Sequence, residues 1–198
     1  MDLDRRTRLT PDERRAQLVA LGVAFLVENP LDALTIEELS ARAGVSRGLL
    51  FHYFGSKQGL HREVVRTARD SMLRATAPAA ELPPLERLHD TLARIVAFVR
   101  EHRGTFYSLV RGVASDDAEV REVVEEAREE QAERLISVFL ELGTADSELL
   151  RTALRAWVSF AEELLVRSAI GSDLASEELV AYLDRSAVAT ADAVHVPG

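Results

Sequence analysis

The sequence predicts an all-α protein with two helical parts, and three observations support this fold class. Two capping boxes, at residues 10–13 (TPDE) and 35–38 (TIEE), mark the starts of helices. Apolar residues recur at helical spacing along most of the chain, and no segment alternates as a strand would. A break rich in proline and alanine over residues 76–84 separates the two parts.

The N-terminal part is expected to begin with two helices. The first starts at residues 10–13, with proline at its first position, and is expected to run until Asn29-Pro30 stops it. The second starts at residues 35–38 and is short. It ends at Gly44, the residue type favoured just past a helix terminus.

A third helix follows after three residues, with Ser46 as its cap and Leu50 and Phe54 as apolar residues. Two short helices joined around a glycine are typical of a helix-turn-helix. We therefore place a three-helix head in residues 1–57, followed by a connecting helix at about 56–75.

The C-terminal part, residues 76–198, is expected to hold five more helices, at about 84–101, 103–114, 116–142, 146–170 and 175–194. Apolar residues cover most of the circumference of the fourth of these, so a single core contact would leave apolar surface exposed. We expect this helix to be buried on two sides, with the last two helices forming a homodimer. A central helix of a monomer is the alternative.

Composition limits the class of protein. The 198-residue chain has 47% hydrophobic residues, enough for one sizeable core or two small ones. It has no cysteine, which excludes a disulfide framework and a thiolate metal site. The first residues lack the apolar core of a secretory signal, and no apolar run approaches membrane-spanning length. We expect a soluble, cytoplasmic protein with no membrane partner.

The net charge of -9 is unevenly distributed along the chain. Residues 1–57 hold eight basic and eight acidic side chains, which leaves 16 basic and 25 acidic ones in residues 58–198. Because the whole negative excess lies in the C-terminal part, the N-terminal part is the one suited to approach phosphate. Lys57 is the only lysine in the chain.

Residues 44–48 (GVSRG) match Gly-x-Ser-x-Gly, the elbow that presents a nucleophilic serine in many hydrolases. That elbow requires a buried strand before it, whereas residues 35–43 carry a capping box and helical periodicity. A serine hydrolase that uses Ser46 is therefore the least favoured function, and we expect no enzyme.

The same residues suit the start of a helix that enters the major groove of DNA. Ser46 caps this helix, so Arg47, Gly48 and Leu49 fall in its first turn, where side chains meet base edges. Arg47 is the expected base reader, and Gly48 permits a close approach of the backbone. His52 is expected near the flanking DNA backbone.

Two further DNA contacts are expected beyond the first turn. Tyr53 is expected near the DNA backbone, on the same helix as His52. Ser56 and Lys57 begin the next helix, where free amides and a positive charge can hold a phosphate.

Residues 35–60 (TIEELSARAGVSRGLLFHYFGSKQGL) resemble the head of the TetR-type bacterial transcriptional repressors. The family pattern has the form T-[I/V]-x-x-[I/L]-A-x-x-A-G-V-S-x-G-x-[L/I/F]-Y-x-[H/Y]-F-x-[S/N]-K-x-x-L, and the resemblance covers roughly residues 12–65. It implies an all-helical homodimer whose two heads bind a palindromic operator in double-stranded DNA. It also implies a C-terminal domain whose small-molecule effector releases the DNA.

The resemblance assigns phosphate contacts to Thr35, Tyr53 and Lys57, and base contacts to Arg47, Gly48, Leu49 and His52. Two residues depart from the family pattern. Ser40 stands where alanine is usual, at a small packed position. Phe51 stands where tyrosine is usual, so one phosphate hydrogen bond is lost, and we expect Phe51 to serve mainly as core.

The C-terminal part offers candidates for a ligand pocket. Phe106, Tyr107 and Trp157 would line it, with His102 or Glu162 as polar handles, as in other helical bundles. Ordinary core is the alternative for aromatic residues at helical spacing. No two histidines lie at ligand spacing on one helix face, so we expect no metal site and no cofactor.

Three functions therefore remain for this sequence. The leading one is a ligand-responsive transcriptional regulator, expected to be a repressor. The second is a helical dimer that binds another protein, without DNA, through the acidic side of the helix at about 116–142. The third is the hydrolase.

Overall fold

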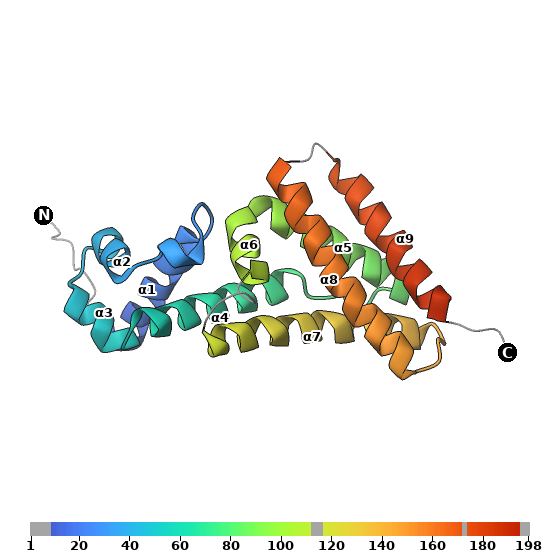
Figure 1. Cartoon of the computed structure of the whole chain (residues 1–198), viewed down its shortest axis with the longest axis horizontal. Helices are drawn as coiled ribbons and strands as arrows, with labels where there is room; N and C mark the ends of the chain where they lie inside the picture. The colour runs from blue at the N-terminus through green and yellow to red at the C-terminus, as the bar shows by residue number, and fades with distance from the viewer. Residues whose placement is uncertain (1–8, 112–116, 172–173, 195–198) are drawn as a thin grey trace, which may run out of the picture.

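The computed structural model describes residues 9–111, 117–171 and 174–194, and these residues form helices and connecting turns without a strand. The predicted all-α fold class is confirmed. Figure 1 shows an elongated molecule, with the first helices at one end and the last helices at the other. None of the described helices is both long enough and apolar enough to span a membrane.

The N-terminal end, which we call the head, contains α1 (Pro11–Phe25), the short 3-10 helix η1 (Leu31–Ala33), α2 (Ile36–Ala43) and α3 (Arg47–Phe54). The capping box predicted at residues 10–13 is formed: the Thr10 hydroxyl accepts from the Glu13 amide, and the Glu13 carboxylate accepts from the Thr10 amide. The one predicted at residues 35–38 is only half formed, because the Glu38 carboxylate accepts from Arg42 instead. Each of α2 and α3 likewise begins with a hydroxyl cap, from Thr35 and Ser46.

The first helix ends earlier than the sequence analysis expected. It stops at Phe25, and the amide and side-chain nitrogens of Asn29 both donate to the Phe25 carbonyl oxygen, at 3.2 and 3.1 Å. These bonds help to satisfy a carbonyl at the end of the helix. The following η1 was not predicted, because a single 3-10 turn has too few residues to give an apolar period.

A long helix, α4 (Lys57–Ala75), leaves the head and runs beside α7 (Ala118–Glu141), as Figure 1 shows. Three ion pairs link these helices: Glu119 pairs with Arg62 and, at 3.9 Å, with Arg66, and Glu126 pairs with Arg69. The buried apolar residues of the head also continue into α7 through Val120, Val123 and Val124. The head is therefore packed onto the rest of the molecule.

The remaining helices form the part that we call the body: α5 (Pro84–Glu101), α6 (Arg103–Arg111), α7, α8 (Glu148–Gly171) and α9 (Ser176–Val194). They agree with the five predicted helices, although the predicted end of the second one, near residue 114, lies outside the described residues. A second buried cluster, which includes Leu92, Ile136, Leu154 and Leu183, joins α5, α7, α8 and α9.

Glutamates along the acidic side of α7 pair with arginines of the same chain. Besides the pairs with α4, Glu129 and Glu133 bind Arg155 of α8 at 2.6 and 2.9 Å. These ion pairs hold α7 between its neighbours. Part of the acidic side that was predicted to face solvent or another protein is therefore paired within the molecule.

Candidate DNA-binding surface and ligand cavity

The turn between α2 and α3 is fixed by Gly44 and by hydrogen bonds from Ser40. Gly44 has φ of 63°, in the left-handed region where side chains are disfavoured. The Ser40 hydroxyl donates to the Val45 carbonyl at 2.5 Å, and the Val45 amide donates to the Ser40 carbonyl at 3.2 Å. The departure from alanine at residue 40 thus adds a bond that the sequence did not reveal.

The α3 helix is anchored by one face and presents the other to solvent. Leu50 and Phe54, four residues apart, are buried in the head. The Ser46 hydroxyl accepts from the Leu49 amide at 3.3 Å and so caps the helix. Arg47 and Gly48 are exposed and Leu49 is half-buried, which puts the first turn of α3 at the surface.

Four residues predicted to contact the DNA backbone lie at the start of α2, on α3 and at the start of α4. His52 is exposed on α3, and its ring lies 5.5 Å from the half-buried Tyr53 ring, centroid to centroid. Lys57 begins α4, and its ammonium donates to the Asp32 carbonyl at 2.9 Å. Thr35 caps α2 by accepting from the Glu38 amide at 3.0 Å.

Arg47 has a partner within the protein. Its Nη1 lies 3.1 Å from Oε1 of Glu37 on α2, and both side chains remain more than half exposed. The exposure keeps this ion pair weak, so it holds the guanidinium at the surface without burying it.

The expectation that Phe51 belongs to the core is wrong. Phe51 is 49% exposed, because it follows the buried Leu50 by one residue and is therefore rotated about 100° around the helix from it. The next residue, His52, is exposed as well. An apolar contact can thus occupy the place where a tyrosine hydroxyl would donate.

The structure also contradicts the geometry that a serine nucleophile needs at residue 46. The element before Gly44 is α2, a helix, whereas a nucleophile elbow follows a strand. Ser46 is the N-cap of α3, and its hydroxyl oxygen accepts from a backbone amide.

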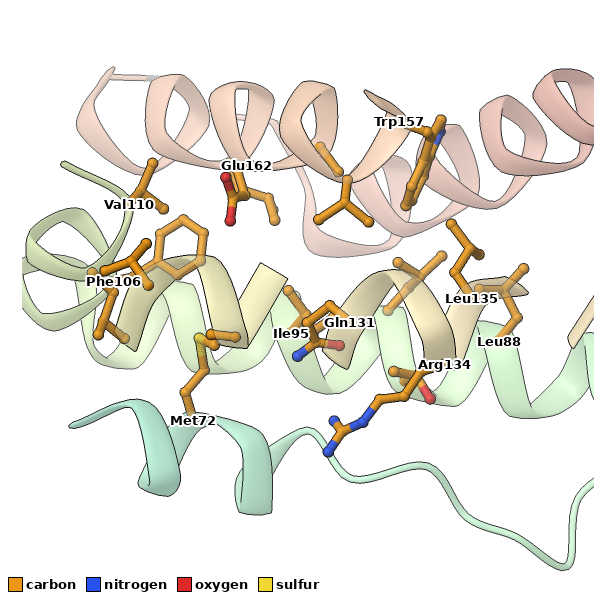
Figure 2. Close-up of a pocket in the computed structure, with 18 residues that line it drawn as sticks. Met72, Leu88, Ile95, Phe106, Val110, Gln131, Arg134, Leu135, Trp157 and Glu162 are labelled. Carbon is orange, nitrogen blue, oxygen red and sulfur yellow. The ribbon is translucent and has the colours of Figure 1, made fainter. Parts of the chain in front are cut away.

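The body encloses a cavity of about 90 Å³ between α4, α5, α6, α7 and α8. Most of its lining is apolar: Met72, Leu88, Leu92, Ile95, Phe106, Leu109, Val110, Val124, Ala127, Leu135, Trp157, Val158, Ala161 and Leu165. Four polar side chains complete the wall: Thr91, Gln131, Arg134 and Glu162. Figure 2 shows Phe106 and Glu162 facing each other across it.

Three of the five predicted pocket residues line this cavity, namely Phe106, Trp157 and Glu162. The other two lie elsewhere. His102 ends α5, with its ring 4.7 Å from the Phe98 ring. Tyr107 lines a surface crevice between the segment after α1 and the start of α6, and Phe106 lines both this crevice and the cavity.

Polar groups of the cavity wall are bonded to the protein. The Arg134 guanidinium donates to the carbonyls of Leu73 and Thr76 at the end of α4, at 3.3 to 3.4 Å, and to Glu130 at 2.5 Å. Gln131 donates to the Thr76 hydroxyl at 3.2 Å. These bonds tie α7 to the end of α4.

Glu162 is the one acidic residue of the cavity wall. Its Oε2 accepts from Nε of Arg128 at 2.7 Å, and its side chain is 18% exposed. Burial raises the pKa of the Glu162 carboxyl above its ordinary value, and the hydrogen bond from Arg128 acts in the opposite direction.

Several cavity residues were not predicted from the sequence. Met72, Gln131 and Arg134 come from α4 and α7, and nothing in their local pattern separates them from surface or core residues. Only the crossing of helices distant in sequence brings them together. Within the described residues, no group of three or more histidine, aspartate or glutamate side chains is placed to hold a metal ion.

The helix-turn-helix with its exposed first turn defines the class of protein, a helix-turn-helix DNA-binding protein. A sequence model described as "Bacterial regulatory proteins, tetR family" matches residues 18–64, and one described as "Tetracyclin repressor-like, C-terminal domain" matches residues 84–190. The chain belongs to the TetR family of transcriptional regulators.

Similar proteins include the HTH-type transcriptional regulator BetI of Cronobacter sakazakii, 36% identical over 43% of this chain and 41% of that protein. The HTH-type transcriptional activator FasR of Mycolicibacterium smegmatis is 30% identical over 54% of this chain and 49% of that protein. The matched region thus spans less than half the length of each of these curated relatives.

Solved structures extend the similarity to nearly the whole chain. A tetR-family transcriptional regulator from Streptomyces coelicolor has a TM-score of 0.82 at 25% identity, over 94% of this chain and 85% of that one. A TetR-like transcriptional regulator from Rhodococcus sp. RHA1 has a TM-score of 0.69 at 23% identity, over 91% of this chain and 97% of that one.

Proposed function

We propose that the protein is a repressor that binds a palindromic operator as a homodimer and is released from it by a small-molecule effector. The observation that carries this proposal is the course of α4. This helix begins at Lys57, three residues after the end of α3, and contributes Met72 to the cavity. One rigid element thus joins the DNA-binding surface to the ligand cavity.

The DNA contacts follow from exposure and position. Arg47, Gly48, Leu49 and His52 would meet base edges, and Thr35, Ser46, Tyr53 and Lys57 would position the head on phosphates. Residues 1–57 would form the DNA-binding domain, with a connecting helix at about 56–75, and residues 76–198 the effector-binding and dimerisation domain.

The outer face of α8 and α9 is the proposed dimer interface. Phe160 is 42% exposed and Tyr182 46% exposed, with their rings 6.3 Å apart between centroids. Small side chains adjoin them, namely Thr152, Ala156 and Ser159 on α8 and Ala189 on α9, all exposed. Such a face lets a second pair of helices approach closely and cover the two rings.

Effector release would follow from a change in the spacing of the two heads. A dimer must match half-sites about 34–36 Å apart, or a multiple of that. An effector that fills the cavity against Met72 would shift α4 and so the head. Because the effector binds one arrangement better than the other, it lowers the affinity for the operator.

The direct experiment is the selection of random duplex DNA by the purified protein. An enriched palindrome is expected, and enrichment of unrelated sequences would contradict the proposal. A reporter gene under the selected site distinguishes repression from activation, since a repressor lowers expression when the protein is present.

Two variants test the assignment of contacts on the selected site. Arg47→Ala is expected to cost about 1–3 kcal/mol and to relax base preference at one position of each half-site. Lys57→Ala is expected to weaken binding to all sequences alike and to reduce the salt dependence. Equal losses of Arg47→Ala on the operator and on random DNA would contradict its role as base reader.

A further inference from the structure

The lining of the cavity is mostly apolar, and Glu162 is its one acidic residue. Both contacts that Arg128 makes with Glu162 go to Oε2, with Nε and Nη2 each 2.7 Å away. Among the described residues, no donor bonds Oε1 of Glu162. Figure 2 shows the Glu162 carboxylate extending from α8 toward the Phe106 ring.

Arg128 does not neutralise the Glu162 carboxylate alone, because it also pairs with Glu125 at 3.0 Å. One guanidinium therefore faces two carboxylates, and the three groups carry a net charge of minus one when both acids are ionised. Glu125 is exposed and in contact with water, whereas Glu162 is largely buried and at the cavity wall. The unbalanced negative charge therefore acts on a ligand inside the cavity.

The other charged residue of the wall, Arg134, is already occupied. Its donors bond the Leu73 and Thr76 carbonyls and the Glu130 carboxylate. In Figure 2 its guanidinium points away from the cavity, toward the segment after α4. The lining residues of α4, α5 and α6 are uncharged. An anionic ligand would therefore meet Glu162 without an available cation.

An aromatic ring beside the carboxylate favours a cation further. Figure 2 shows Phe106 near Glu162, and the faces of such rings attract a cation that has lost its water. Trp157 lines the cavity toward its other end. The Trp157 indole N–H donates to the Ser186 hydroxyl at 3.0 Å, which fixes the ring. The charged group and the apolar remainder of a ligand would thus each meet a matching part of the wall.

We propose that the ligand of this cavity is an apolar molecule with a single ammonium group, which Oε1 of Glu162 binds while the rest of the molecule fills the space between α4 and α8. This inference rests on the proposed function, since it names the chemical class of the effector.

Three probes with one apolar body test the proposal on the unaltered protein: 4-phenylbutylamine, 4-phenylbutan-1-ol and 4-phenylbutanoate. Affinity is measured by titration calorimetry, and the fluorescence of Trp157, the only tryptophan in the chain, reports occupation of the cavity. The amine is expected to bind at least tenfold more tightly than the alcohol, and the carboxylate most weakly. Equal affinities, tightest binding of the carboxylate, or no binding of the amine would overturn the proposal.

A pair of variants tests which carboxylate is responsible for the preference for the amine. Glu162→Gln keeps an oxygen that can accept from Arg128, and is expected to reduce the affinity for the amine at least tenfold while that for the alcohol changes less than threefold. Glu125→Gln removes the other carboxylate of the same arginine, outside the cavity, and should leave the preference for the amine in place. Equal effects of the two variants would refute the role of Glu162.

The readouts separate this inference from the proposed function. Ligand binding and the preference for the amine are measured without DNA, and operator affinity is then measured with and without the amine. If the preference is present but operator affinity is unchanged, the ligand class stands and the proposed release is wrong. If the preference is absent, the ligand class is wrong whatever the operator result.

Discussion

Gly48 lies in the first turn of α3, where a glycine is expected to lower stability but to favour DNA binding. A Cβ added there would meet only the Ser46 hydroxyl oxygen, at 3.9 Å, so the protein itself has room for a side chain. Glycine inside a helix is less favourable than alanine by about 1 kcal/mol. The advantage of glycine is therefore expected in the bound state, where DNA lies against the turn.

Gly48→Ala is expected to change stability and binding in opposite directions. The free energy of unfolding should rise by up to about 1 kcal/mol. Operator binding should weaken by about 1–3 kcal/mol, as for loss of one base contact. Urea unfolding and fluorescence anisotropy measure the two quantities. A variant that is more stable and binds the operator as well as before would contradict the close approach of α3.

His61 is a buried titratable residue at the centre of the head. Its Nε2 donates to the Leu34 carbonyl, at 2.8 Å, and so ties α4 to the segment before α2. Burial lowers the pKa of His61 below its ordinary value, and the hydrogen bond to the carbonyl partly opposes this. The folded head therefore favours the neutral ring.

The free energy of unfolding should consequently fall in acid. Because the folded pKa of His61 lies below its unfolded value of about 6.5, its contribution is complete above that pH and is lost as the pH falls through the folded pKa. Urea unfolding between pH 7.5 and 5 measures this loss. His61→Gln retains a donor for the Leu34 carbonyl but cannot titrate, so its stability should depend less on pH. Equal pH dependence in the two proteins would contradict the assignment.

At the scale of elements, the outer face of α8 and α9 gives a direct test of the homodimer. Phe160→Glu would put a charge where the proposed interface buries an aromatic ring, and is expected to convert the dimer to a monomer. Sedimentation velocity at micromolar concentration measures the change. Leu142→Glu is the matched control, because Leu142 is 46% exposed at the end of α7, outside α8 and α9. Dissociation by both variants alike would contradict the proposed interface.

Helix boundaries were predictable where a local signal marks them. The hydroxyl caps at Thr10, Thr35 and Ser46 start helices as predicted, since capping depends on residues only three apart. The side of α3 on which Phe51 lies was not predictable from its apolar character. Its orientation depends on which neighbours anchor the helix, and here those are Leu50 and Phe54.

The cavity was predictable only in part, for a similar reason. The aromatic residues Phe106 and Trp157 could be proposed because aromatic side chains often line pockets in helical bundles. His102 and Tyr107 share that character but lie outside, because one ends a helix and the other lines a surface crevice. Which polar residues reach the cavity depends on how α4, α7 and α8 cross, and no local pattern encodes this.

At the scale of the whole molecule, Arg134 joins the cavity to the helix that leaves the head. It lines the cavity on α7 and holds two carbonyls at the end of α4. A ligand that displaces α7 would therefore pull on α4 through these bonds. The ion pairs of α4 with Glu119 and Glu126 join the same two helices nearer the head.

Arg134→Met is expected to weaken the coupling between ligand binding and operator binding more than it weakens ligand binding itself. Methionine retains much of the apolar stem but has no donors for the Leu73 and Thr76 carbonyls. Ligand affinity without DNA should change less than threefold, while the effect of the ligand on operator affinity, typically about 1–3 kcal/mol for coupled sites, should fall by half or more. Glu130→Gln is the control, since it leaves Arg134 and its bonds to α4 in place. Undiminished coupling in Arg134→Met would exclude this route.

Lys57 also allows the head to be labelled at one lysine side chain. It is the only lysine among 198 residues, it is half-buried, and its ammonium is bonded to the Asp32 carbonyl. An amine-reactive dye would therefore have a single lysine side chain to label, at the start of the helix that leads to the cavity. The acylation rate of that side chain could then serve as a footprint of DNA occupancy, read from one peptide in a mass spectrum.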